Sequence, residues 1–344
     1  MAGGPSTPAL AIAVSQAGGL GCLAAGYKKA DAVREDIQAV RGATDAPFGV
    51  NVFVPSTERG DPDELRSYLE RIAPEAERQG AALGEPRFDD DGWEAKLTLV
   101  CDERPAVVSF TFGCPPADVF ARVHDADICV WVTITNVDEA RAAHAAGADG
   151  LVVQGTEAGG HRGGFIDDGS DEGGIGLLAL LRITARATPL PMIATGGIMD
   201  GAALAAVLCA GASAAQVGTA LMLSPEAATA EAQRAVMPEP GPTRVTRAFS
   251  GRPARGIVNR FLAEHSASAP LAYPEIHHAT SPLRAAARKR GDADGFNLWA
   301  GQAHELGQAR PAGEIVREMA DEAEAILARV SAGRRDPGTS GGSR

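Results

Sequence analysis

The stretch MIATGGIMDGAALAAVLCAGASAAQVGTALM, residues 192–222, decides the fold class. It opens with a short apolar run at Met192–Thr195 and passes through a Gly-Gly turn into an alanine-rich helical run at Gly201–Ala210. It ends in a second strand-like run at Ala214–Met222. A strand, a helix and a second strand joined by short turns are typical of a parallel β–α–β unit. The sequence therefore predicts an α/β protein with a parallel sheet.

The same alternation extends toward the N-terminus. Further strands are predicted at Leu20–Ala25, Phe48–Val54, Ala106–Phe112, Ile128–Thr133 and Gly150–Gln154. Seven strands are one fewer than a (β/α)₈ TIM barrel contains. The chain begins in a turn, Met1–Thr7, that leads directly into a helix, Pro8–Gln16. We therefore expect a TIM barrel whose first strand is missing from a truncated start; the alternative is an open sheet of seven strands.

The alternation stops after Met222, and the residues that follow are richer in Pro, Arg and His. Behind Pro311, apolar positions recur at helical spacing, which predicts an amphipathic helix. The last residues are polar and rich in Gly and Ser, a composition typical of disorder. The predicted division is a barrel domain at 1–222, a small appended substrate or lid domain at 223–304, a helix within 305–330 that packs back on the barrel, and a disordered tail at 331–344.

Composition excludes several classes of function. The formal net charge of −12 argues against nucleic acid or an anionic membrane as partner, because either requires a basic face. No apolar run is long enough to span a membrane, and no secretory signal is recognisable. The five cysteines include no CxxC pair and no HExxH motif occurs, so no metal site is expected. These features favour a cytoplasmic enzyme.

Two glycine sites follow successive strands near the end of the predicted barrel. Gly196-Gly197 comes after the strand at Met192–Thr195, and Gly218-Thr219 lies late in the next strand. TIM barrels commonly bind a phosphate at this position through backbone N–H groups. Glycine suits such a site because a Cβ atom would hold the phosphate away from the backbone. The alternative is that both sites are only tight turns.

The loop QGTEAGGHRGGF, residues 154–165, places one His–Arg pair among five glycines after a predicted strand. Such a loop can press its backbone against a flat ligand and project an imidazole over it. Histidine suits proton transfer at neutral pH, so His161 is the candidate catalytic residue. The alternative is a hydrogen-bonded loop histidine without a catalytic role. Arg162 is interpreted as an anion ligand or a helix cap.

A cluster of arginines is present in the otherwise acidic chain, and three further side chains are separate candidates for the substrate pocket. The arginine cluster is interpreted as a set of ion pairs with the barrel, and the alternative is that it attracts an anionic substrate. Its members are Arg244, Arg247, Arg252, Arg255 and Arg260. The candidate pocket residues are Tyr273, Trp299 and Ser109.

Taken together, these motifs resemble those of a known family. The opening MAGGPSTPALAIAVSQAGGLGCLAAGY, the loop QGTEAGGHRGGF, and the short motifs ATGGI and GTALM resemble the four signatures of the class I nitronate monooxygenases, formerly 2-nitropropane dioxygenases. The resemblance implies an FMN-bearing TIM barrel in which His161 is the catalytic histidine. The FMN contacts that it implies are Asn51, Gln154, Gly159, Gly197, Gln216, Val217, Gly218 and Thr219.

The reaction implied by the resemblance is the oxidation of alkyl nitronates, such as propionate 3-nitronate, by O₂ to a carbonyl compound and nitrite. Two other readings stay open. One is an NAD(P)H-dependent quinone or enoyl reductase on the same FMN barrel, and the other is a flavin- or phosphate-binding barrel without turnover. The expected assembly is a monomer or a homodimer.

Overall fold

A computed structural model describes residues 1–56, 59–167 and 174–333. Its main feature is one curled parallel sheet of seven strands, in the order β1-β2-β3-β4-β5-β7-β8. The strands are β1 Gly21–Ala24, β2 Phe48–Phe53, β3 Val107–Thr111, β4 Cys129–Ile134, β5 Gly150–Gln154, β7 Met192–Thr195 and β8 Ala214–Gln216. The parallel α/β architecture is therefore confirmed, and the fold is TIM-barrel-like.

One predicted strand is shorter than expected. The run Ala214–Met222 was predicted to be extended throughout, but β8 ends at Gln216 and a 3₁₀ turn, η1 (Thr219–Leu221), follows Gly218. The tight turn brings Gly218 and its neighbours back across the strand end, which a continuing strand would not do. β1 and β8 are the two edge strands of this sheet. The prediction of a strand before Met1 stays a prediction.

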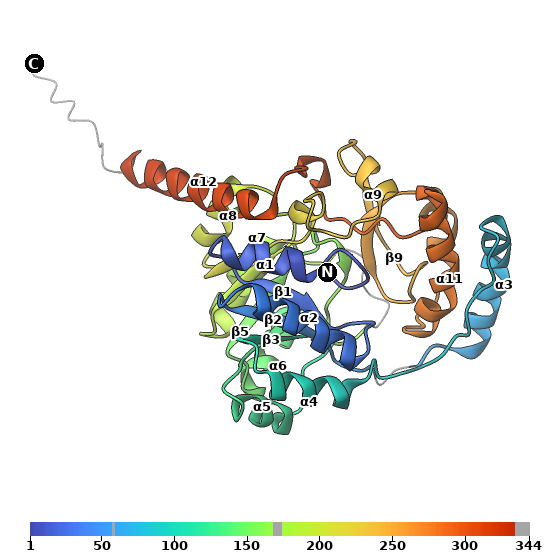
Figure 1. Ribbon diagram of the computed structural model, residues 1–344, viewed down its shortest axis with the longest axis horizontal. Helices are drawn as coiled ribbons and strands as arrows, with labels where there is room; N and C mark the ends of the chain where they lie inside the picture. Colours follow the sequence, from blue (N-terminus) through green and yellow to red (C-terminus); the bar gives the residue numbers. More distant parts are fainter. Residues whose placement is uncertain (57–58, 168–173, 334–344) are drawn as a thin grey trace, which may run out of the picture.

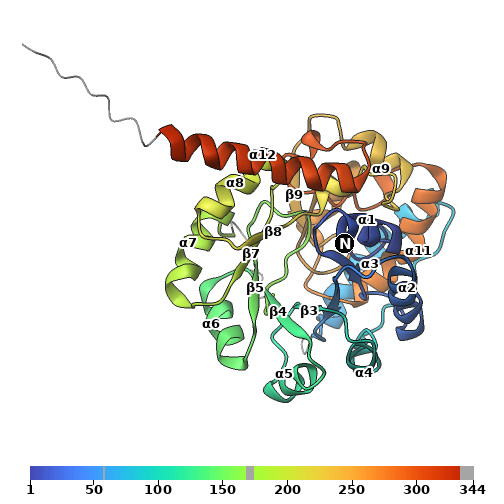
Figure 2. The ribbon, with the colours of Figure 1, turned by 60° about the vertical axis from the view of Figure 1, so that its left-hand side comes forward.

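Helices cover the outer face of the sheet, as Figure 2 shows for α4 to α8. Side chains at their N-termini explain where several begin: Thr7, Asn136 and Asp200 each accept a backbone N–H of the first turn. The helices around the sheet are α1 Pro8–Gln16, α2 Ala30–Ala43, α4 Trp93–Glu103, α5 Ala117–His124, α6 Val137–Ala146, α7 Leu177–Ala187 and α8 Gly201–Cys209.

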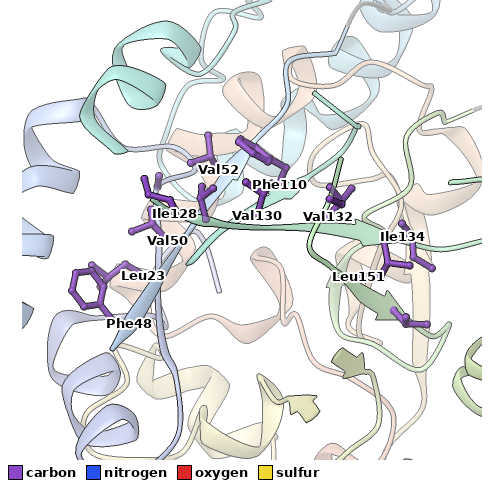
Figure 3. Close-up of a cluster of buried hydrophobic side chains, with 14 of the residues drawn as sticks. Leu23, Phe48, Val50, Val52, Phe110, Ile128, Val130, Val132, Ile134 and Leu151 are labelled. Carbon is purple, nitrogen blue, oxygen red and sulfur yellow. The ribbon is translucent and has the colours of Figure 1, made fainter. Parts of the chain in front are cut away.

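The core of the barrel lies between the strands and these helices (Figure 3). Val130, Val132, Phe110 and Leu151 are completely shielded from solvent. Their runs of β-branched and aromatic residues suit strands that are buried on both faces of a parallel sheet. This packing holds the strand ends, and hence the loops that follow them, in fixed positions.

A second, smaller sheet stands beside the barrel and contains part of the glycine-rich loop. It has three antiparallel strands in the order β6-β10-β9: β6 (Gly160–His161), β10 (Ala254–Ile257) and β9 (Thr243–Thr246). Ala254 pairs with His161, and Arg162 N–H donates to Pro253 O at 2.8 Å. His161 is therefore fixed by hydrogen bonds to residues far along the chain.

The three-stranded sheet and the helices packed around it form a second region. This second region includes α3 (Pro62–Arg78), although α3 lies between β2 and β3 in the sequence. α3 lies against α11 (Glu275–Arg290), as Figure 1 shows. Tyr68 of α3 is 1% exposed, and its hydroxyl donates to Ala248 O at 2.6 Å. The domain boundaries predicted from the sequence stay predictions. The remaining short helices of this region are α9 Glu231–Val236, α10 Arg260–His265, η2 Ser266–Ser268, η3 Ala293–Gly295 and η4 His304–Leu306.

The last helix, α12 (Ala312–Gly333), crosses α8 and α1 on the outside of the barrel (Figures 1 and 2). Glu322 fastens it there by accepting the backbone N–H of Gly201 at 2.8 Å. The helix continues to Gly333, three residues beyond the predicted start of the disordered tail; residues 334–344 lie outside the described residues. Within the described part of the chain, no helix is long and apolar enough to cross a membrane.

Candidate active site

A large cavity of about 770 Å³ opens at the carboxyl ends of the barrel strands and against the second region. All nine residues predicted for the site line it: Asn51, Gln154, Gly159, His161, Gly197, Gln216, Val217, Gly218 and Thr219. They come from four separate parts of the chain, so the fold brings them together. The volume is that of an ordinary ligand pocket. The part each residue takes in binding stays a prediction.

One end of the cavity is made of glycine backbone. Gly196 and Gly197 have φ angles of +123° and +70°, a region that side chains rarely tolerate. A Cβ atom on Gly197 would lie 3.2 Å from Cβ of Glu157, and one on Gly159 would lie 2.3 Å from the backbone N of Gly301. Any larger residue at Gly159 would therefore displace backbone from the cavity wall.

Two amide side chains connect the barrel strands to the cavity. Asn51 Nδ2 donates to Ser109 Oγ and Thr111 Oγ1, both at 2.9 Å, which directs its nitrogen toward β3. Gln154 donates from Nε2 to His161 O at 3.0 Å and accepts from Gly163 N at 2.8 Å. Both ends of Gln154 thus hold the loop that carries His161. Ser109, predicted as a pocket residue, instead supports Asn51.

His161 is enclosed and hydrogen-bonded. Its Nε2 lies 2.9 Å from Ser250 Oγ, and its ring makes a T-shaped contact with Trp299 at 5.6 Å between centroids. Burial, with the positive charges of Arg252 and Arg284 as smaller contributions, lowers the pKa of His161 to about 3. The imidazole is therefore neutral at physiological pH.

Two arginines, Arg162 within the histidine loop and Arg252 outside it, donate hydrogen bonds to the loop backbone. Arg162 donates to Gly155 O at 2.8 Å, and Arg252 donates to the carbonyl oxygens of Arg162 and Gly164. The Arg252 guanidinium also lies 4.2 Å from the ring centroid of Phe112. These contacts join the loop after β5 to the second region.

The arginine cluster has mixed roles. Arg247 pairs with Asp167 in the loop after β5 at 2.6 Å, as the ion-pair interpretation predicted. Arg260 instead pairs with Glu75 of α3, outside the barrel, at 2.7 Å. Arg252 differs, because no carboxylate among the described residues lies within ion-pair distance of it. Its partners are carbonyl oxygens and an aromatic ring.

Several cavity residues carried no motif and were missed as site residues. They are Tyr27, His277, Arg284, Arg288 and Asn297. The rings of Tyr27 and His277 stack at 3.9 Å between centroids, and the Tyr27 hydroxyl lies 3.2 Å from that of Tyr273. The spacing of His277, Arg284 and Arg288 on one helix face was the signal that could have grouped them.

Comparison with known proteins agrees with this geometry. A model of the nitronate monooxygenase family matches residues 1–322. A protein named nitronate monooxygenase from Pseudomonas aeruginosa is 42% identical over 93% of this chain and 93% of its own length.

Two solved structures extend the comparison. The nitroalkane oxidase of Streptomyces ansochromogenes is 49% identical, with a TM-score of 0.94, covering 96% of this chain and 95% of that one. FabK from Thermotoga maritima is more distant, at 26% identity and a TM-score of 0.73, covering 96% of this chain and 93% of that one. The family model spans both the barrel and the second region, including the histidine loop. The chain belongs to the nitronate monooxygenase family.

Proposed function

We propose that the cavity binds FMN and that its glycine end receives the phosphate. The fit rests on the chain itself: a Cβ atom on Gly159 or Gly197 would meet neighbouring protein atoms, so both positions require glycine and present bare backbone in the cavity wall. Among the described residues, no acceptor is found for the backbone N–H of Gly197 or Gly218. Free N–H groups at glycine turns are suited to phosphate oxygens.

We propose that the reaction is the oxidation of an alkyl nitronate by O₂ to a carbonyl compound and nitrite. The observation that carries this proposal is a neutral histidine in the same cavity as the glycine cradle. A flavin, when bound, accepts electrons from an electron-rich substrate and passes them to O₂. The remaining work falls to the protein: to orient the substrate, exclude water and manage one proton.

His161 is proposed to be the base for neutral nitroalkanes. Ser250 Oγ lies 3.2 Å from Arg252 O, to which its hydroxyl can donate, leaving the oxygen lone pairs for His161 Nε2–H. In that tautomer Nδ1 of His161 is the free acceptor, and it takes the α-proton of a nitroalkane. A substrate that arrives as the nitronate needs no such step and requires only orientation.

The deciding experiment is an anaerobic titration of the purified protein with propionate 3-nitronate. We expect the absorbance of the bound flavin to change without NADH, and nitrite to appear when air is admitted. A flavin absorbance that does not change with the nitronate but is bleached by NADH would instead identify the reductase that was the alternative interpretation of the sequence. A protein that binds no flavin under any condition would refute both.

A further inference from the structure

Two guanidinium groups lie together at the cavity wall with no counter-charge. Arg284 and Arg288, one turn apart on α11, both line the cavity, and Arg284 is 6% exposed. Within residues 1–56, 59–167 and 174–333, neither has a carboxylate within ion-pair distance. Arg247 and Arg260, by contrast, each pair with a carboxylate.

Burying positive charge without a counter-charge is costly, although Arg284 donates to the neutral acceptors Thr280 Oγ1 and His277 O. Burial and the charge of Arg288 lower the pKa of Arg284 to about 9, which still leaves it protonated at neutral pH. Buried charges in proteins are normally paired, because water no longer solvates them. Two adjacent cations at a cavity therefore favour an anionic occupant.

Arg284 and Arg288 donate to the same acceptor, the side-chain oxygen of Asn297, and this sets the orientation of the Asn297 amide. Asn297 Oδ1 accepts from Arg284 NH1 at 3.2 Å and from Arg288 NH2 at 2.8 Å. The oxygen of the amide must face the guanidinium groups, so the Nδ2 group faces the other way. Asn297 is 7% exposed, and Nδ2 has no acceptor among the described residues. Because Asn297 lines the cavity, this donor is available to a ligand there.

The chain alternates around Asn297 in a way that directs it into the cavity. Phe296 and Leu298 point into a hydrophobic cluster, whereas Asn297 and Trp299 line the cavity. This alternation is that of an extended segment, and Leu298 O accepts from Ile257 N of β10 at 2.9 Å. Because Trp299 contacts the ring of His161, Asn297 shares the cavity wall beside the proposed base.

We propose that Asn297 donates from Nδ2 to an oxygen of the substrate's nitronate group, and that Arg284 and Arg288 are positioning residues that hold this amide and supply positive charge. The inference rests on the proposed function, since it assigns the part of the site that recognises the planar oxyanion. Donors fixed in advance toward a charged oxygen stabilise it without reorganising.

The test measures binding of sodium nitrate, a planar oxyanion that does not react, by calorimetry at constant ionic strength. Asn297→Asp keeps an acceptor for both arginines but replaces the donor with a second oxygen. We expect it to weaken nitrate binding by about 10- to 100-fold. The matched control is Asn136→Asp, which changes the same charge at the N-cap of α6 and should leave the affinity unchanged, because aspartate caps equally well.

The positioning role of Arg288 is tested separately, by the nitrate affinity of two substitutions at that position. Arg288→Lys keeps a positive donor for Asn297 Oδ1, whereas Arg288→Met removes it. Nitrate affinity should fall with methionine and be largely restored with lysine. A merely structural role would make both variants lose thermal stability in parallel, with affinities that follow stability rather than charge, and that result would overturn the assignment.

The outcomes separate this inference from the proposed function. Nitrate binding that depends on Asn297, in a protein that fails to oxidise any nitronate, would retain the oxyanion site and refute the reaction. Nitronate oxidation with an unchanged KM in Asn297→Asp would retain the reaction and overturn the site. Wild-type protein that binds no nitrate at millimolar concentration would also overturn it.

Discussion

The two ends of the cavity are built from different materials. The glycine end (Gly159, Gly196, Gly197, Gly218 and Gly301) offers backbone, from the loops after barrel strands and, for Gly301, from the segment after Trp299. The arginine end (His277, Arg284, Arg288, Asn297 and Trp299) offers charged, amide and aromatic side chains from α11 and the segment after it. A backbone site suits a group that is the same in every turnover, such as the phosphate of the proposed cofactor. A site made of side chains can be altered by substitution to suit a different substrate. His161 lines the same cavity from a strand of the second sheet.

The largest expected effect is that of a substitution at His161. His161→Asn keeps a polar side chain of similar reach but cannot accept a proton. Turnover of neutral nitroalkanes should fall by about 10²- to 10⁴-fold, the usual contribution of a general base. Turnover of nitronates supplied already deprotonated should fall much less. Steady-state kinetics on both forms of one substrate check this, and equal losses would remove the base assignment.

The next largest effect concerns the glycine end alone. Gly197→Ala places a Cβ atom at a positive φ and 3.2 Å from Cβ of Glu157, so the turn must shift. FMN binding should weaken by about tenfold, measured by fluorescence titration of the apoprotein. Nitrate binding at the arginine end should be unchanged. The control is Gly42→Ala in α2, where a Cβ atom meets nothing within 4 Å and flavin affinity should not move.

A smaller effect is expected from the support of His161. Ser250→Ala removes the hydroxyl that lies 2.9 Å from Nε2, so the imidazole loses its fixed orientation. We expect kcat with nitroalkanes to fall about fivefold, the worth of one neutral hydrogen bond, with flavin content unchanged. Ser268→Ala, whose hydroxyl donates only to His265 O, serves as the control. No change in kcat would show that Ser250 does not orient the base.

The smallest effect is on stability against pH. The pKa of His161 is lowered to about 3 in the folded protein, whereas an unfolded histidine titrates near 6.5. Above pH 6.5 both states are neutral; below it only the unfolded chain gains the proton. Stability should therefore be lost toward pH 3, at up to about 1.4 kcal/mol per pH unit. Urea midpoints at pH 7.5, 6.5 and 5.5 should fall less steeply for His161→Asn, and identical slopes would contradict the assignment.

The same contrast explains what could be predicted from the sequence. The barrel strands and the glycine end were accessible because alternation and Gly-Gly turns are local patterns, and the residues predicted for the site share one cavity. The 3₁₀ turn after Gln216 was missed because an apolar run does not reveal where a strand stops. Asn297 and Arg284 were missed because their pairing depends on contacts across 13 positions of the chain. No local pattern encodes such a contact.

The strand that carries His161 has a consequence for protein engineering. Since β6 is hydrogen-bonded to β10 and its loop is held by Arg252, the base is furnished by a strand of the second sheet although its sequence lies between barrel strands. A chimera that exchanges only residues after the barrel between two relatives would separate the histidine from its own support. The smallest transplantable module must therefore join residues 160–165 to the β9–β10 hairpin and α11, three pieces that are contiguous only in space.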